Sequence, residues 1–228
     1  MTELSAFGLE EEGLVFVPET EYRVRQSVLK PLQALSASAL ASGFSLRIES
    51  AYRSFDRQLS IWNRKATGKL KLLDKNGVPF RELPRDEETL MRSILFWSAL
   101  PGTSRHHFGT EIDVVDGASV PPGYQVELTE EECDSLFAKF HAWLSREIEG
   151  GSSFGFERVF VPGRGKIQPE RWHLSHRPSA RELERLFRPQ ELRRIYEKSD
   201  IELKSAILDN FDELMRDYVF PYFETSPI

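Results

Sequence analysis

The stretch Ser-Arg-His-His-Phe-Gly-Thr-Glu-Ile-Asp, residues 104–113, decides the fold around the candidate site. It runs on into two valines, and the apolar residues around Asp113 predict a short strand over 111–115. A carboxylate buried in such a strand is unfavourable unless it is paired, and a bound cation would offset that cost. Gly109 lets the backbone turn ahead of the strand. The stretch therefore predicts a metal ligand on a strand, with His106 as a second ligand nearby.

A second pair of histidines lies in Glu-Arg-Trp-His-Leu-Ser-His, residues 170–176. A catalytic zinc takes three protein ligands from His and carboxylate and leaves one position for water. His106, Asp113 and His173 form such a set. Glu170 is then the candidate for the carboxylate that takes a proton from water and passes it to the leaving amine. Each residue alone has an ordinary explanation, such as a surface pair or a salt bridge, so the joint pattern carries the weight.

Three motifs, taken in order, resemble the VanY-type D-alanyl-D-alanine carboxypeptidases, which belong to the LAS group of zinc peptidases. The family pattern is Ser-Gly-Tyr-Arg-Ser-x-x-x-Gln, then Ser-x-His-x-x-Gly-x-Ala-x-Asp, then Glu-x-Trp-His. This chain has Ser-Ala-Tyr-Arg-Ser at 50–54 followed by Gln58, the stretch at 104–113, and Glu-Arg-Trp-His at 170–173. The resemblance spans residues 44 to about 177.

The resemblance implies a role for each matching residue. His106, Asp113 and His173 match the zinc ligands, which makes Zn²⁺ the implied cofactor, and Glu170 matches the catalytic base. Arg53 matches the arginine that contacts the substrate carboxylate or the developing oxyanion, and a guanidinium suits either task. Outside the motif, a surface salt bridge would be the ordinary explanation for Arg53.

Further residues are expected in the substrate cleft, namely Tyr52, Gln58, Ser104 and Trp172. Glu111 departs from the family pattern, which has a small residue there. Residues 111 and 113 of a strand point to the same face. We therefore expect Glu111 near the metal cleft, where it binds a substrate ammonium or pairs with an arginine. His107 and His176 match no ligand. We expect His107 to pack in the interior or behind the ligands.

The resemblance and the local sequence patterns together predict an α+β fold, in which a small, mainly antiparallel sheet carries the zinc site and helices flank it. Residues 1–177 are expected to form the catalytic domain, with the motifs within 44–177, and residues 178–228 a helical extension packed on it. The local patterns predict a helix over 21–42 with Thr20 as N-cap, a strand over 44–50, a helix over 55–65, a loop or hairpin over 66–84, a helix ending near 101–102, a helix over 129–150 behind a capping box of Thr129 and Glu132, and strands over 159–161 and 171–174.

Composition excludes several classes of function. The net charge is −6 and no block of Lys or Arg stands out, so nucleic acid and membrane surfaces are poor partners. Cys133 is the only cysteine, which rules out an intramolecular disulfide and a Cys-based zinc site. Residues 1–16 contain four acidic residues, no Lys or Arg, and no long apolar run, unlike a signal peptide. We therefore expect a cytoplasmic protein, either a monomer or a homodimer.

These expectations favour a zinc carboxypeptidase that releases terminal D-Ala from peptidoglycan-derived peptides. In the cytoplasm, cleavage of D-Ala-D-Ala ends would destroy wall precursors, whereas L,D-cleavage of recycled tetrapeptides would not. The L,D reaction is therefore the leading hypothesis, with the D-Ala carboxylate near Arg53 and a diaminopimelate ammonium near Glu111. The alternatives are a D,D-carboxypeptidase and a phage-type wall endopeptidase. A binding protein on the same fold and a purely helical structural protein explain fewer of the motifs.

Overall fold

The structure, a computed structural model, describes residues 1–224, and its centre is a four-stranded sheet with the order β3-β4-β6-β5. The strands are β3 (Leu46–Ser50), β4 (Glu111–Asp116), β5 (Phe156–Glu157) and β6 (His173–His176), and all neighbours are antiparallel. In the central pair, Asp113 of β4 lies directly opposite His173 of β6. The predicted α+β fold with a small antiparallel sheet is thereby confirmed.

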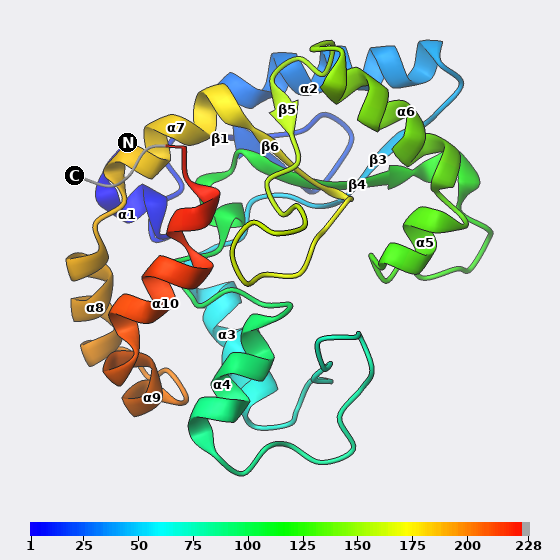
Figure 1. The fold of residues 1–228 in the computed structure, drawn as a ribbon. Coiled ribbons are helices and arrows are strands. Elements are labelled where there is room, and N and C mark those ends of the chain that lie inside the picture. The colour runs from blue at the N-terminus through cyan, green and yellow to red at the C-terminus, as the bar shows by residue number, and fades with distance from the viewer. Residues whose placement is uncertain (225–228) are drawn as a thin grey trace.

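Strand β4 is buried along its whole length, because other parts of the protein cover both of its faces. Ile112 and Val114 point into an apolar core shared with α2 (Gln26–Ala41) and α6 (Ala138–Glu149), which lie along one side of the sheet (Figure 1). Side chains alternate along a strand, so the residues between them point to the other side. Asp113 is thereby directed away from this core.

Helices on the other side of the molecule share a second apolar core. They are α1 (Glu3–Ala6), α3 (Phe55–Ala66), α4 (Glu87–Leu95), α7 (Arg177–Leu186), α8 (Pro189–Lys198), α9 (Lys204–Asp209) and α10 (Phe211–Tyr218). Trp62 and Ile94 come from before residue 177, and Tyr196 and Phe211 from after it, yet all four are buried in this core. The apolar packing is continuous across residue 177. The predicted boundary there, between a catalytic domain and a helical extension, stays a prediction.

The remaining elements are short. They are β1 (Leu14–Phe16) paired with β2 (Arg23–Arg25), α5 (Glu130–Asp134), and the 3-10 turns η1 (Arg105–Phe108), η2 (Gly117–Ser119) and η3 (Phe220–Tyr222). Between α3 and α4 the chain makes a long excursion with one isolated bridge, Leu73 to Pro79, as the predicted loop or hairpin requires (Figure 1). Within residues 1–224, no helix combines the length and the apolar composition needed to cross a bilayer.

Several local predictions differ from the structure. The helix predicted to end near 101–102 ends at Leu95, and the strand predicted over 171–174 runs over His173–His176. The helix predicted over 21–42 begins at Gln26, with Arg25 rather than Thr20 at its N-cap, because residues 23–25 pair with β1. The helix over 129–150 has the predicted capping box but is split into α5 and α6. Residues 159–161 form no strand, since Val159 and Phe160 pack against Tyr222 instead.

Candidate metal centre and active site

The sheet and the turn before it bring the three predicted ligands together. Asp113 of β4 and His173 of β6 are opposite each other, and His106 lies in η1 just ahead of β4. His173 Nδ1 is 3.0 Å from Asp113 Oδ1, and His106 Nε2 is 3.3 Å from Asp113 Oδ2. One ligand atom from each residue lies within 4.8 Å of the others, and all three side chains are buried.

Gly109 makes the turn between the histidine and the strand. Its φ of 68° is in the left-handed region that favours glycine, and its N–H closes the turn on the His106 carbonyl at 3.2 Å. A Cβ at this position would lie 2.6 Å from the side chain of Leu14. The turn therefore depends on glycine for its backbone conformation and for its close packing.

The second nitrogen of each ligand imidazole has its own partner. His106 Nδ1 lies 2.7 Å from the Ala51 carbonyl oxygen, which only accepts, so Nδ1 carries a proton and Nε2 is the nitrogen that faces Asp113. His173 lies between two carboxylates, with Nε2 3.1 Å from Glu111 Oε2 and Nδ1 3.0 Å from Asp113 Oδ1. With a cation at Nδ1, the ring proton would be on Nε2 and directed to Glu111. Partners of this kind fix the orientation of metal-binding histidines.

The electrostatics of this group fit a divalent cation. Burial alone would lower the pKa of His173, but its hydrogen bonds with Asp113 and Glu111 raise that pKa to about 10. For Asp113, burial opposes the charged form, yet the neighbouring imidazoles hold its pKa well below the usual range. The pocket therefore favours positive charge beside its carboxylates, and two nitrogens with one oxygen form a donor set that zinc accepts.

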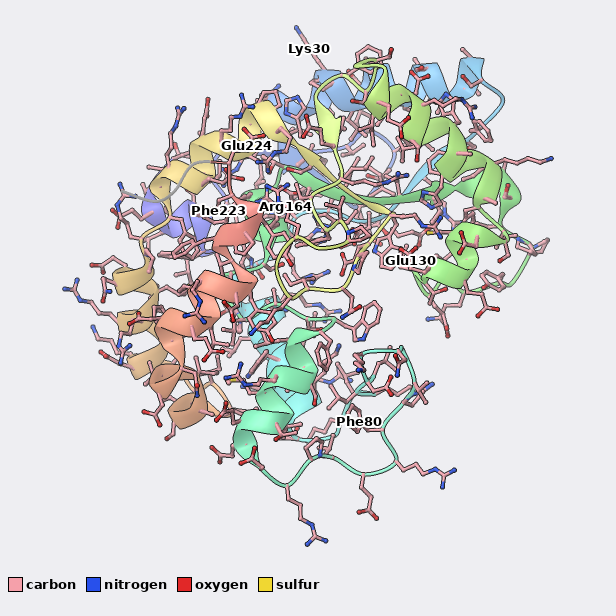
Figure 2. The ribbon with its side chains drawn as sticks, in the orientation of Figure 1. Lys30, Phe80, Glu130, Arg164, Phe223 and Glu224 are labelled. Carbon is pink, nitrogen blue, oxygen red and sulfur yellow. The ribbon has the colours of Figure 1, made fainter. Side chains whose placement is uncertain are left out.

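A cavity of about 470 Å³ opens onto this group. Among its lining residues are the three candidate ligands, Arg53, Glu170, Ser104 and Trp172. It extends from Phe223, beyond the last helix, to Glu130 at the start of α5 (Figure 2). Ser104 and Trp172 thus lie in the predicted cleft, and their contact with a substrate stays a prediction.

Glu170 lies beside the candidate ligands without joining them. Its Oε2 is 3.8 Å from His173 Nδ1, and its side chain is 16% exposed. Burial raises the pKa of Glu170 to about 7, with the Asp113 carboxylate adding to the rise and His173 and Arg53 opposing it. A carboxyl group of this pKa exchanges a proton readily near neutral pH, which is the property a general base needs.

Arg53 faces the same cavity with only neutral partners. Its Nη1 donates to Gln58 Oε1 at 2.9 Å and its Nη2 to Ser50 Oγ at 3.2 Å. Within residues 1–224 it forms no ion pair, and burial lowers its pKa. The salt-bridge explanation therefore does not apply, and the charge of Arg53 is available to an anion in the cavity.

Gln58 and Tyr52 do not line the cavity, so their prediction as cleft residues is wrong. Gln58 is only 1% exposed, because it holds Arg53 with its oxygen and donates its amide N–H to the Ala99 carbonyl at 2.7 Å. Tyr52 turns away and donates to the Gly8 carbonyl at 3.2 Å. Gln58 acts on the site through Arg53, whereas Tyr52 fastens the N-terminal segment.

The prediction that Glu111 meets a substrate ammonium is also wrong. Its side chain is completely buried, and its Oε1 accepts from Arg105 at 3.1 Å and from Ser175 at 2.9 Å. Its Oε2 is directed to His173. Both oxygens of Glu111 therefore have hydrogen-bond partners outside the cavity. Glu111 pairs with an arginine, which was the alternative expectation.

His107 and His176 lie outside the ligand group. His107 Nδ1 is 2.6 Å from the Arg53 carbonyl, and its Nε2 accepts from the Gly102 N–H at 2.9 Å. His176 Nδ1 is 2.9 Å from Ser179 Oγ. Both are buried side chains that connect segments, which was the expectation for His107.

One residue near the site was missed in the sequence. Lys65 of α3 donates to Ser98 Oγ at 2.6 Å, and Ser98 lines the cavity. Burial, with a smaller effect of Arg53, lowers the pKa of Lys65 to about 8. Lys65 follows Gln58 by seven residues on a helix, and this spacing places both on one face. That spacing could have identified it.

Comparison with known proteins agrees with this geometry. A family model described as "VanY: D-alanyl-D-alanine carboxypeptidase" matches residues 21–179. Two curated relatives from Haemophilus influenzae are described only as uncharacterized proteins. One is 35% identical over 96 residues, which cover 41% of this chain and 66% of the relative, and the other is 25% identical over 124 residues, which cover 53% and 92%.

Two solved structures share the fold at low sequence identity. VanYB in complex with D-alanine-D-alanine is 19% identical with a TM-score of 0.51, and the match covers 80% of this chain and 88% of that one. The LdcB LD-carboxypeptidase is 18% identical with a TM-score of 0.53, and the match covers 88% and 79%. At these identities the likeness establishes the fold.

We expect one divalent ion to bind per chain at the group of His106, Asp113 and His173. His173→Ala removes a nitrogen donor that lies 3.0 Å from Asp113, so the variant should lose the ion. His176→Ala is the matched control, since His176 is on the same strand but contacts Ser179. Metal content after dialysis, measured by mass spectrometry, checks this. Equal metal content in the two variants would contradict it.

Proposed function

The chain belongs to the VanY family of D-alanyl-D-alanine carboxypeptidases, a family of zinc-dependent peptidases, and on that premise we propose that it releases the C-terminal D-Ala of peptidoglycan-derived peptides. The observation that carries this proposal is the guanidinium of Arg53, which shares one cavity with Glu170 and the His106–Asp113–His173 group. A cation without a carboxylate partner is suited to hold the free carboxylate of a peptide end.

In the proposed mechanism, His106 Nε2, an Asp113 oxygen and His173 Nδ1 hold the zinc ion. When bound, zinc supplies Lewis acidity that polarises a carbonyl group and acidifies water. Glu170 accepts the proton of the attacking water and delivers it to the nitrogen of the departing D-Ala. The pKa of about 7 that burial gives Glu170 suits it to both halves of this transfer.

Arg53 fixes the direction of the peptide in this proposal. Gln58 and Ser50 orient the guanidinium, and neither neutralises its charge. Lys65, which is held by Ser98, adds positive potential at the same end of the cavity. The terminal carboxylate is therefore bound at this end, and the scissile bond is the peptide bond that joins the terminal residue to the rest of the peptide.

For the bond that is cleaved, we propose the L,D reaction on tetrapeptides during cytoplasmic recycling of wall material. The support is the chemical argument that trimming a tetrapeptide leaves the D-Ala-D-Ala donors of crosslinking intact. D,D-cleavage of pentapeptides and endopeptidase activity are the competing outcomes, and cleavage rates on the pentapeptide and on a C-terminal amide distinguish them from the L,D reaction.

Glu170→Gln should keep the metal and lose turnover. The amide is the same size as the carboxyl group but cannot accept the proton, so kcat should fall by roughly 10²–10⁴-fold, the usual contribution of a positioned acid–base group. Metal content and kcat measured on the same preparation check this. Normal turnover would mean that another group is the base.

A C-terminal amide should be a poor substrate if Arg53 binds the peptide carboxylate. The unmodified protein should cleave the free acid at least roughly tenfold faster in kcat/KM than the amide, as expected for loss of a charge-assisted contact. Arg53→Lys should narrow that preference, because an ammonium cannot form the paired contact. Arg57→Lys, an exposed residue of α3, is the control. Equal cleavage of acid and amide would favour the endopeptidase.

The tetrapeptide should release D-Ala faster than the pentapeptide if the L,D proposal holds. Both peptides end in D-Ala and differ in the residue that precedes it, so the comparison isolates the centre before the scissile bond. Released D-Ala and the shortened peptides are measured by mass spectrometry. Faster release from the pentapeptide would restore the D,D alternative.

A further inference from the structure

Glu111 is the buried carboxylate that the proposed mechanism leaves without a role. It is completely buried beside His173, on the face of β4 that also carries Asp113. We propose that Glu111 is a positioning residue for the metal centre: it accepts the Nε2–H of His173 and thereby turns Nδ1 toward the metal. This inference rests on the proposed function of the His106–Asp113–His173 group.

The hydrogen bonds around His173 support this role. Its Nδ1 faces Asp113 at 3.0 Å, and its Nε2 faces Glu111 at 3.1 Å, so one ring is held between two carboxylates of the same strand. The two nitrogens cannot exchange roles without a proton facing the metal position. A carboxylate behind a ligand histidine fixes the tautomer and increases the basicity of the ligand nitrogen.

Arg105 allows a carboxylate to remain charged at this depth. Its Nη2 donates to Glu111 Oε1 and to Ser175 Oγ, each at 3.1 Å. Its Nη1 donates to Glu184 of α7 and to the Tyr222 carbonyl, each at 3.0 Å. Arginine stays protonated even when buried, so Glu111 is compensated by a permanent charge.

Glu111 itself is neither a ligand nor a base. Its Oε2 lies on the Nε2 side of the ring, opposite to the nitrogen that faces Asp113, and both oxygens have donors of their own. It does not line the cavity. Its effect on the reaction must therefore pass through His173, and it should change metal affinity before it changes any contact with the peptide.

Glu184 offers a matched control. It is also completely buried and also pairs with Arg105, but its other partners are Arg177 and the backbone N–H of Glu224, and it does not contact His173. Glu184→Gln and Glu111→Gln each replace one of the two carboxylates that pair with Arg105 by a neutral amide. A role limited to folding would give the two variants the same zinc affinity.

The test is zinc affinity by chelator competition, with thermal unfolding of the metal-free proteins measured alongside. Glu111→Gln should weaken zinc binding by about 10–100-fold, and Glu184→Gln by less than about twofold, although both lower the melting temperature. Glu111→Asp keeps the charge beside Arg105 and shortens the reach to His173. It provides the folded variant if the amide does not fold, and it should also weaken zinc binding.

The possible outcomes are distinct. Unchanged zinc affinity in Glu111→Gln or in Glu111→Asp would overturn the positioning role, as would an equal loss in Glu184→Gln. In each of these cases the unmodified protein still binds zinc, and the proposed function stands. Failure of the unmodified protein to bind zinc would overturn the proposed function, and this inference with it.

Discussion

The pairing of Asp113 with His173 across β4 and β6 is the contact on which the rest of the site depends. Because the two residues are directly opposite each other in the sheet, the backbone pairing of β4 and β6 fixes the distance between these two candidate ligands. A slip of one residue would turn Asp113 into the apolar core and bring Ile112 to the metal position. The core under α2 and α6 opposes that slip, because Ile112, Val114 and Leu174 are buried in it. Packing on one face of the sheet therefore fixes the chemistry on the other.

Two arginines, the buried Arg105 and the half-buried Arg53, differ in how the protein compensates their charge. Arg105 is surrounded by Glu111, Glu184 and a carbonyl, so its charge is neutralised within the protein. Arg53 has only an amide and a hydroxyl, which orient a guanidinium without neutralising it. Removing a charge from water costs free energy, and a charged partner offsets part of that cost. The first arrangement compensates a charge within the interior, and the second leaves charge for a ligand.

The sequence predicted the ligand group, the neighbouring carboxyl group and the class of fold, because each of the motifs that carry them is recognisable within a short stretch of sequence. It failed where a side chain's direction depends on distant segments. Gln58 was expected in the cleft, yet the Ala99 carbonyl and Arg53 hold it behind the cavity wall. Glu111 was placed on the correct face of its strand, but Arg105 and Ser175 close that part of the face to any ligand. Alternation along a strand gives the side of the sheet, and only the packing decides whether that position is open.

Residues within 218–223 contribute to the site even though they lie outside the recognisable motifs. Tyr218, Tyr222 and Phe223 line the cavity, and the Tyr222 carbonyl accepts from Arg105. Glu184 of α7 holds the same arginine from the other side. The helices after residue 177 therefore contribute a wall of the cavity and half of the charge balance behind His173. A change in this segment can reach the metal centre through Arg105 and Glu111, because each contact along that route is buried and hydrogen-bonded.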